Sequence, residues 1–209
     1  MKTIDPYKYP STVILGNGEF PQAQLPLDIL DKASKVVICD GAANTYVKTG
    51  KPFDIIIGDG DSIDDDIRQQ YASRIIISSC QETNDQTKAV TYLAAQGIND
   101  IAIVGATGKR DDHTLGNISL IIDYFKQGIT AHIYTDHGIF LPAHGNTAIT
   151  TRPGQQISIF NFGCTQLSAQ GLQYPIRPFD NWWQGTLNEA TADRCIFTAD
   201  GTFLLYLAY

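Results

Sequence analysis

The stretch from Asp54 to Ile63, DIIIGDGDSI, constrains the fold of this chain more than any other part of it. Three consecutive β-branched residues predict a short strand buried on both faces, as in the interior of a parallel sheet. The chain then turns at Gly58 and presents Asp59 and Asp61. Strands of open α/β sheets bring binding groups to their carboxyl ends. The stretch therefore predicts a parallel sheet with a binding site at this edge.

The two carboxylates allow two interpretations. An oxygen-only pair on a glycine-flanked turn suits a hard cation such as Mg²⁺ that must also hold phosphate oxygens. A solvated acidic turn is the alternative, because turns favour Asp and Gly for backbone reasons alone. The motifs elsewhere in the chain favour the metal site.

Apolar runs alternate with helical patterns up to residue 136. Strands are expected at 12–15, 35–39, 55–57, 74–77, 100–104 and 131–135, and helices at 25–33, 40–48 and 112–125 and after 64–66 and 80–88. This alternation predicts the α/β class, with a mostly parallel, doubly wound (Rossmann-like) sheet and right-handed crossovers. Residues 1–136 are expected to form this domain.

The pattern changes after Asp136. Short β-rich runs are separated by Gly, Pro, Asn and Asp, and no long helical pattern remains; the runs cover 139–141, 156–160, 194–198 and 203–207. Residues 137–209 are therefore predicted to form a small all-β sandwich or barrel. No low-complexity linker separates the two parts, which predicts tight packing.

Composition excludes several classes of protein. The chain has 209 residues, of which 43% are hydrophobic, and a net charge of −7 without any run of Lys or Arg, which argues against a nucleic-acid partner. The four cysteines are far apart and lack a C-x-x-C pattern, which favours reduced thiols. No apolar stretch approaches membrane-spanning length, and residues 1–6 contain no apolar signal region. We therefore expect a cytoplasmic protein without a membrane partner.

Polar groups follow other strands as well. Asp40 comes directly after the run 35–39, and it is either a ligand or a helix N-cap. Asp85 and Lys88 share a helix face, either as site residues or as an ordinary surface ion pair. The segment 105–117 combines small residues, Lys and Arg before a helix, which makes a plausible phosphate cradle although the G-K-[ST] ending of a Walker A motif is absent.

Five motifs in order resemble those of the thiamine pyrophosphokinases, and the resemblance spans almost the whole chain. They are D-G-[GA]-A-N at 40–44, G-D-x-D-S at 58–62, T-D-x-x-K-A at 84–89, G-G-R-x-D-H-x-L-x-N at 108–117, and G-L-x-Y-P with S-N-E at 171–176 and 187–189. The chain departs from the family at four of these positions or near them: Cys80 replaces the Asp of a D-Q-x motif, Asn84 replaces a Thr, Lys109 replaces a Gly, and Leu187 replaces a Ser.

The resemblance implies an enzyme that moves the terminal pyrophosphate of ATP onto the hydroxyl of thiamine, giving thiamine diphosphate and AMP. It implies Mg²⁺ as cofactor, ATP as co-substrate, and a homodimer with thiamine bound between the α/β domain of one subunit and the β-domain of the other. Phosphoryl-type transfer needs positioning and charge neutralisation more than covalent help.

The resemblance also implies roles for single residues. Asp59, Asp61 and Asp85 would be metal ligands, with Asp40 completing or orienting the shell, and Asp112 would orient or deprotonate the thiamine hydroxyl. The residues expected to bind the nucleotide are Gly41, Asn44, Ser62, Lys88, Thr107, Lys109, Arg110, His113 and Asn117. Those expected to bind thiamine are Trp182, Trp183, Asn188 and Glu189. The two tryptophans either offer aromatic faces to the cationic thiazolium or fill the core or a dimer contact.

Two other functions fit parts of the sequence. A metal-dependent glycosyltransferase would use Asp59 and Asp61 as its D-x-D motif, and release of AMP from ATP and thiamine would exclude it. A Ca²⁺-binding module is disfavoured, because an EF-hand register from Asp59 puts Ile63, Asp64 and Gln70 where a ligand, Gly and Glu are required.

Overall fold

The computed structural model describes all 209 residues, which form two compact units. The α/β unit is Tyr9–Asp136, and the β unit combines Met1–Lys8 with His137–Tyr209. We had expected the first eight residues in the α/β part. They lie in the β unit because β1 (Lys2–Ile4) pairs with β9 (Thr147–Thr150). The catalytic and thiamine-binding roles assigned to the two parts stay predictions.

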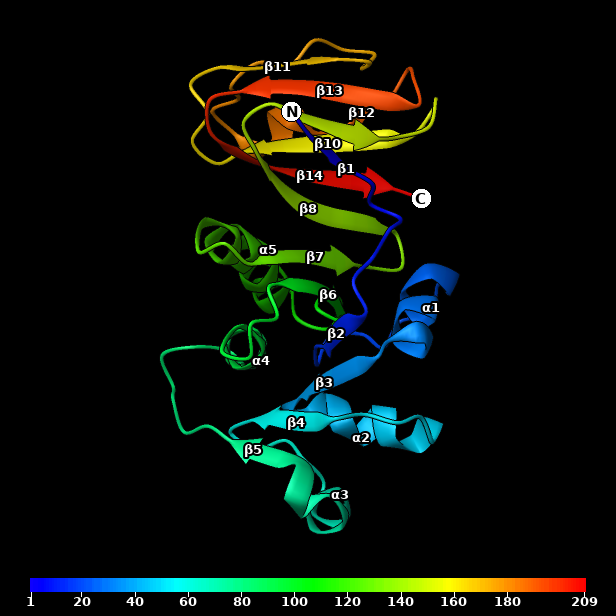
Figure 1. Cartoon of the computed structure of the whole chain (residues 1–209), viewed down its shortest axis with the longest axis vertical. Helices are drawn as coiled ribbons and strands as arrows, with labels where there is room; N and C mark the ends of the chain where they lie inside the picture. The colour runs from blue at the N-terminus through cyan, green and yellow to red at the C-terminus, as the bar shows by residue number, and fades with distance from the viewer. The chain divides into compact units, whose positions relative to one another are not determined.

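Six strands form the sheet of the α/β unit in the order β7-β6-β2-β3-β4-β5, and every pairing among them is parallel (Figure 1). The chain runs outward from β2 to β5 and then returns to the other side of β2 for β6 and β7. Their bounds are β2 (Thr12–Leu15), β3 (Lys35–Cys39), β4 (Ile55–Gly58), β5 (Ile75–Ile77), β6 (Asp100–Val104) and β7 (Thr130–Tyr134).

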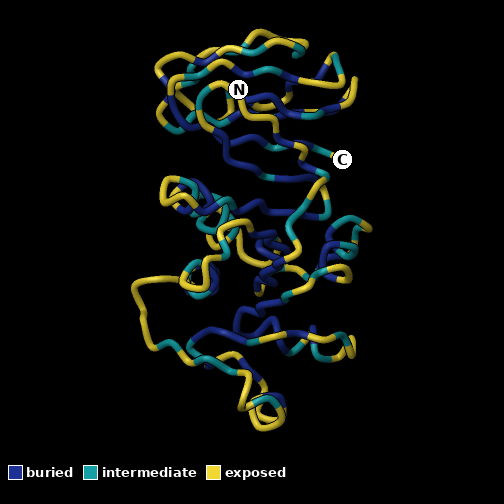
Figure 2. The backbone as a smooth tube through the Cα atoms, in the orientation of Figure 1, coloured by how far each residue is buried: buried dark blue, intermediate teal, exposed yellow.

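Helices cover both faces of this sheet, with α1 and α2 on one side and α4 and α5 on the other (Figure 1). The central strands are buried, whereas the outer helix surfaces are exposed (Figure 2). The mixed α/β class of this unit is thus confirmed. The helices are α1 (Gln24–Lys32), α2 (Ala43–Tyr46), α3 (Asp65–Gln70), α4 (Asp85–Ala94) and α5 (Asp111–Lys126), with the 3₁₀ turns η1 (Asp40–Ala42), η2 (Val47–Thr49) and η3 (Ala72–Arg74).

Helix α1 begins without a capping side chain of its own. The carboxylate of Asp136, which follows β7, instead accepts the backbone N–H groups of Gln22 and Ala23 at 2.9 Å each. A carboxylate at this end satisfies free N–H groups and opposes the positive end of the helix dipole. The last residue of the α/β unit is thereby fixed to its first helix.

The β unit contains two sheets, one with the order β1-β9-β13-β11 and one with the order β12-β10-β14-β8. The buried rings of Phe197 on β13 and Phe203 on β14 lie 5.3 Å apart and join the two sheets. The expected C-terminal β unit is confirmed, although strands β1, β9, β11 and β12 were not predicted. The remaining bounds are β8 (Gly138–His144), β10 (Gln156–Asn161), β11 (Leu167–Gln170), η4 (Trp182–Gly185), β12 (Asn188–Glu189), β13 (Arg194–Ala199) and β14 (Thr202–Ala208).

Across both units, no helix combines the length and the apolar character needed to cross a bilayer.

Candidate functional site

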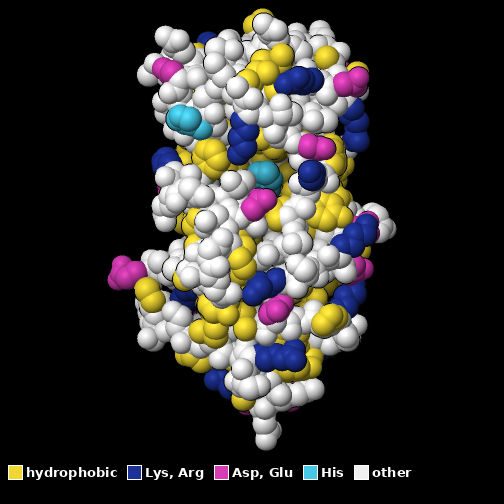
Figure 3. Space-filling model, in the orientation of Figure 1, with side chains coloured by type: hydrophobic (Ala, Val, Ile, Leu, Met, Phe, Trp, Pro, Cys, Tyr) yellow, Lys and Arg dark blue, Asp and Glu magenta, His cyan; other side chains and the backbone are white.

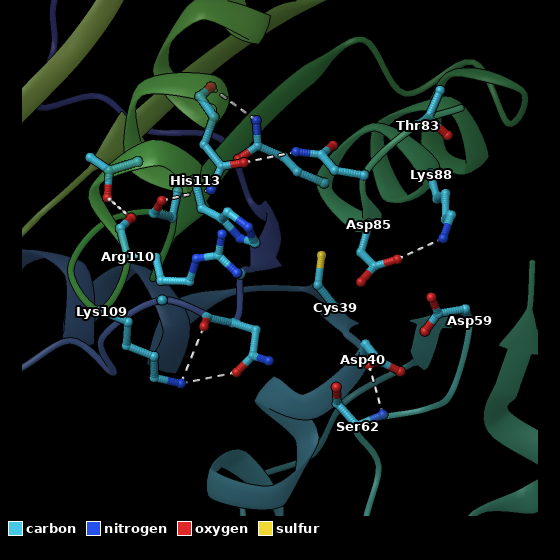
Figure 4. Close-up of a pocket in the computed structure, with 18 of the residues that line it drawn as sticks. Cys39, Asp40, Asp59, Ser62, Thr83, Asp85, Lys88, Lys109, Arg110 and His113 are labelled. Atoms are coloured by element: carbon cyan, nitrogen blue, oxygen red, sulfur yellow. Dashed lines mark hydrogen bonds and ion pairs between the residues drawn. The ribbon is translucent and has the colours of Figure 1, made fainter. Parts of the chain in front are cut away.

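Loops at the carboxyl ends of the parallel strands enclose a cavity of about 480 Å³ (Figure 4). Every residue that lines it belongs to the α/β unit. The cavity lies beside β2 and β6, where the strand order reverses, and open α/β sheets bind ligands at this kind of position.

Most of the residues predicted for catalysis, metal binding and nucleotide binding line this cavity. They are Asp40, Asp59, Asp61, Ser62, Asp85, Lys88, Lys109, Arg110, His113 and Asn117. Four predicted residues do not line it, namely Gly41, Asn44, Thr107 and Asp112.

Three carboxylates converge in the cavity. Asp40, Asp59 and Asp61 each place one oxygen so that the three atoms lie within 4.8 Å of one another. Burial raises the pKa of Asp40, and the nearby charges of Asp85 and Asp59 add to this effect. The pKa of Asp59 is lowered, chiefly because its Oδ1 accepts the backbone N–H of Asp61 at 3.3 Å. Three oxygen ligands at this spacing could hold a divalent cation.

Asp40 also shapes the turn that carries its two partners. Its carboxylate accepts the backbone N–H groups of Gly60 at 2.9 Å and Ser62 at 3.2 Å. An N-cap role was the alternative interpretation of Asp40 in the sequence, but the N-cap of η1 is Cys39. Asp40 has a φ of 39°, in the left-handed region, and a Cβ on Gly58 would lie 2.6 Å from the Asp40 Cβ. The site thus requires a glycine directly before Asp59.

Asn44 supports the same turn from α2. Its Nδ2 donates to the carbonyl oxygen of Ser62 at 2.8 Å and to Asp64 Oδ1 at 2.9 Å, and its Oδ1 accepts the Asp64 N–H at 3.0 Å. The motif at 40–44 therefore holds the loop of the motif at 58–62. Asn44 does not line the cavity, and its contact with the nucleotide stays a prediction.

Asp85 and Lys88 form an ion pair at 2.9 Å inside the cavity. The Lys88 side chain is only 6% exposed, so this is not an ordinary surface pair. Burial lowers the pKa of Lys88, but the hydrogen bond and the charge of Asp85 outweigh burial, and the pKa is raised. In the structure the oxygens that lie together are those of Asp40, Asp59 and Asp61, whereas Asp85 Oδ1 accepts a hydrogen bond from Lys88 Nζ. The role of Asp85 as a metal ligand stays a prediction.

Basic side chains lie on the wall formed by the loop between β6 and α5 and by the first turn of α5. Lys109, Arg110 and His113 occupy one side of the cavity, and the carboxylates of Asp40 and Asp59 occupy the other (Figure 4). Lys109 Nζ donates to the carbonyl oxygen of Asn17 at 3.2 Å and to its Oδ1 at 3.1 Å.

Arg110 makes two hydrogen bonds to Asp112, from Nε at 3.1 Å and from Nη2 at 2.6 Å. These bonds are the main reason that the pKa of Asp112 falls to about 2. The Asp112 side chain is 64% exposed and does not line the cavity. The residue proposed as a candidate base is thus a partner of Arg110.

Sequence reasoning missed part of the cavity wall, above all the turn Gly16–Gly18 after β2. The N–H groups of Gly16 and Gly18 donate to the carbonyl oxygens of Val104 and Gly105 at 2.8 and 2.7 Å. A Cβ on Gly18 would lie 2.3 Å from the Thr107 carbonyl oxygen, so only glycine fits. The Gly-x-Gly pattern directly after the first predicted strand is the sequence signal that could have identified this turn as part of the site. The other residues missed are Cys39, Gln81, Thr83, Asn84, Gln86, Ala106, Gly108 and Thr114.

The four residues predicted to bind thiamine lie in the β unit. Trp182 packs against the rings of Phe160 and Phe162, at 5.9 and 5.7 Å, whereas Trp183 is 74% exposed. Asn188 is buried, and its side chain exchanges hydrogen bonds with the backbone N–H and carbonyl of Tyr174.

Trp182, at 47%, Trp183 and Glu189 are thus exposed, and Asn188 alone of the predicted set is buried; Glu189 lies on β12.

On the face drawn in Figure 3, Lys and Arg side chains lie scattered among Asp and Glu rather than gathered in one patch. A polyanionic ligand on this acidic protein would depend on cations placed locally, such as those of the cavity wall.

Carboxylates that face cations across one cavity, at the reversal point of a parallel sheet, are the arrangement that holds a metal-bound polyphosphate. The fold and the site thus define an α/β enzyme of the class that transfers phosphoryl-type groups.

Comparison with known families identifies the family. Residues 27–133 match the family model "Thiamin pyrophosphokinase, catalytic domain", and residues 138–206 match "Thiamin pyrophosphokinase, substrate-binding domain". The chain belongs to the thiamin pyrophosphokinase family. It is therefore a transferase, which makes thiamine diphosphate from thiamine with ATP as co-substrate. The glycosyltransferase and the Ca²⁺-binding module are thereby set aside.

Solved structures of thiamin pyrophosphokinases share the fold. The enzyme from Candida albicans aligns with a TM-score of 0.79 at 17% identity, over 99% of this chain and 92% of that one. The enzyme from Bacillus subtilis gives a TM-score of 0.78 at 21% identity, over 94% and 98%. The yeast enzyme gives 0.79 at 16% identity, over 99% and 90%. A search of curated proteins found no match.

Proposed function

We propose that the cavity of the α/β unit binds Mg²⁺-ATP and that pyrophosphate transfer to thiamine takes place there. The observation that carries this proposal is the group of three carboxylates facing the cations of the β6–α5 loop. We also assign the unit to the doubly wound, Rossmann-like class, which the parallel pairings and the helices on both faces support.

The three carboxylates fit Mg²⁺ in chemistry and spacing. Oxygen ligands at opposite corners of a Mg²⁺ octahedron lie roughly 4.2 Å apart, and the oxygens of Asp40, Asp59 and Asp61 lie within 4.8 Å. When bound, the ion would neutralise charge on the phosphate oxygens. Asp59 and Asp61 would hold the ion from the turn after β4, and Asp40, whose carboxylate accepts the Gly60 and Ser62 N–H groups of that turn, would offer a third oxygen.

The cations have separate tasks in this proposal. Asp85 keeps the buried ammonium of Lys88 charged and in place, beside the acidic group. Arg110, Lys109 and His113 bind non-bridging phosphate oxygens from the opposite wall.

Asp112 acts through Arg110 in this proposal. Both of its oxygens accept bonds from the guanidinium group, and a carboxylate with a pKa of about 2 is a weak proton acceptor near neutral pH. Of the two roles considered for Asp112, orientation is therefore favoured over deprotonation of the thiamine hydroxyl.

Thiamine is bound with the help of the β unit, which matches the substrate-binding domain of the family. Trp183 offers an exposed aromatic face, which suits a cationic thiazolium ring. We further propose that the active form is a homodimer, to be tested by sedimentation of the active enzyme. The four free cysteines agree with a cytoplasmic location, because reducing compartments keep thiols free.

The test of the proposed function is an AMP-release assay with thiamine and ATP. Release should require both substrates, stop with EDTA and return with Mg²⁺. Asp59→Asn should lower the rate by about 10² or more, the scale of one lost preorganised contact to developing charge. Release of AMP that ignores EDTA, or an Asp59→Asn variant with parental turnover, would remove the carboxylate group from the reaction.

A further inference from the structure

Lys109 differs from the other basic side chains of the cavity in its partners. Lys88 is paired with Asp85, and Arg110 is paired with Asp112. Lys109 donates only to the two uncharged oxygens of Asn17. It is the one Lys or Arg lining the cavity whose charge has no carboxylate partner.

The backbone of Lys109 is strained. Its φ of 33° lies in the left-handed region, which glycine adopts readily and residues with a Cβ disfavour. Only two other residues with a side chain have a positive φ, Asp40 and Leu187, and Asp40 shares the cavity with Lys109. Strained backbone of this kind clusters at functional sites. The backbone conformation that places the Lys109 side chain in the cavity therefore lowers the stability of the folded state.

The position of Asn17 is fixed by its neighbours. Gly16 and Gly18 are hydrogen-bonded to the loop after β6, and neither position has room for a Cβ. The ammonium group of Lys109 therefore rests at a defined point of the cavity wall, on neutral oxygens. Phosphate oxygens carry charge and form stronger hydrogen bonds with an ammonium group than amide oxygens do.

We propose that Lys109 makes the site selective for the charge of the nucleotide, so that ATP is held and AMP is released. This inference rests on the proposed function. ATP has two phosphate groups that AMP lacks, so it offers an ammonium group more charged oxygens, even where Mg²⁺ offsets part of its net charge. Lys88 and Arg110 each have a carboxylate partner that offsets their charge. Of the three basic side chains, Lys109 should therefore gain most in attraction when the nucleotide carries more phosphate groups.

The test measures dissociation constants of ATP, ADP and AMP by calorimetry in the presence of Mg²⁺. Lys109→Gln removes the charge and leaves a polar side chain that is one atom shorter, and Lys109→Arg keeps the charge. Lys109→Gln should weaken ATP binding about ten-fold, the scale of one charge-assisted hydrogen bond, and should weaken AMP binding no more than about three-fold. Lys109→Arg should retain most of the selectivity. Lys48→Gln, which removes one exposed lysine outside the cavity, should leave all three constants at parental values.

Lys109→Gly adds a second readout, since glycine suits the observed φ. Without nucleotide this variant should melt at or above the temperature of Lys109→Gln, while it loses selectivity to the same extent. A lower melting temperature for Lys109→Gly than for Lys109→Gln would contradict the strain argument.

Equal weakening of ATP, ADP and AMP in Lys109→Gln, or no weakening, would overturn the charge selectivity. The proposed function is judged separately, by AMP release from the parent enzyme. If the parent releases AMP with thiamine but Lys109→Gln keeps parental selectivity, only the inference about Lys109 fails.

Discussion

Replacing Asp61 by Asn tests the acidic group with little disturbance of the fold. Asp61 is exposed, and its Oδ1 accepts the Ser62 hydroxyl at 2.9 Å, a bond that an Asn oxygen can keep. At the 4.8 Å limit that separates the three oxygens, two unit charges repel by about 0.9 kcal/mol in water. Asp61 has two such neighbours, and salt screens part of the repulsion. The metal-free variant should therefore be more stable by about 1 kcal/mol, which raises Tm by about 2–4 °C in a chain of this size.

Mg²⁺-ATP should reverse this order. At a ligand concentration of about 100 times the dissociation constant, binding stabilises the parent by about 2.7 kcal/mol, whereas Asp61→Asn should gain much less. Turnover should fall by a factor of about 10². Melts with EDTA and with Mg²⁺-ATP, together with AMP release, measure all three quantities.

Asp193→Asn serves as the control, because it removes one exposed carboxylate of the β unit. It should change neither turnover nor the gain from Mg²⁺-ATP. Parental turnover in Asp61→Asn, or an equal gain from Mg²⁺-ATP in parent and variant, would refute the reasoning.

Four further predictions concern other parts of the structure. Asp85→Asn leaves the buried Lys88 ammonium unpaired, so it should lower the free energy of unfolding, measured in urea, by about 3–5 kcal/mol. Adding Lys88→Met should recover much of this loss, whereas additive losses would contradict the pairing. The pKa of Lys88 is raised above 10.5 in the folded state, so the charged Lys88 stabilises the fold below pH 10.5, and this stabilisation is lost as the pH rises through the pKa of the folded state. Above about pH 10.5 the parent should therefore lose stability more steeply than Lys88→Met. Asp112 has a pKa of about 2 and stays ionised, so Asp112→Asn should lower kcat/KM without moving the acidic limb of its pH profile between pH 5 and 8; a shifted limb would restore Asp112 as a base. Trp183→Ala should raise the KM for thiamine at unchanged Tm, whereas Trp182→Ala should lower Tm because it loses the contacts with Phe160 and Phe162.

The strands of the α/β unit were predictable because each is a short, largely apolar run, and four of them, β2, β3, β4 and β6, end in Gly or are followed directly by Gly or Asp. Asp59 and Asp61 follow β4, and Asp40 follows β3, so the parallel sheet brings all three to one edge. The strands β1, β9, β11 and β12 gave no such signal, because they are short and only partly apolar.

The roles of single side chains were harder to predict. Asn44 and Asp112 occupy motif positions, yet their hydrogen bonds go to Ser62, Asp64 and Arg110 rather than into the cavity. Which group a polar side chain contacts depends on three-dimensional neighbours that spacing along the chain does not specify. The turn Gly16–Gly18 was missed for the same reason, since its glycines are required by carbonyl groups of the loop after β6.

The pairing of β1 with β9 has a consequence for synthesis of the protein. Lys2 lies opposite Thr147, so at translation rates of about 5–20 residues per second the first strand waits roughly 10–30 s for its partner to be made. During that time residues 9–136, which are contiguous in the chain, can complete their own fold. The nascent edge strand stays unpaired meanwhile and is open to chaperones or to a fused tag. Removing the first eight residues should therefore destabilise the sheet that contains β1 and leave the cavity intact, because all residues of the α/β unit are synthesised before β9.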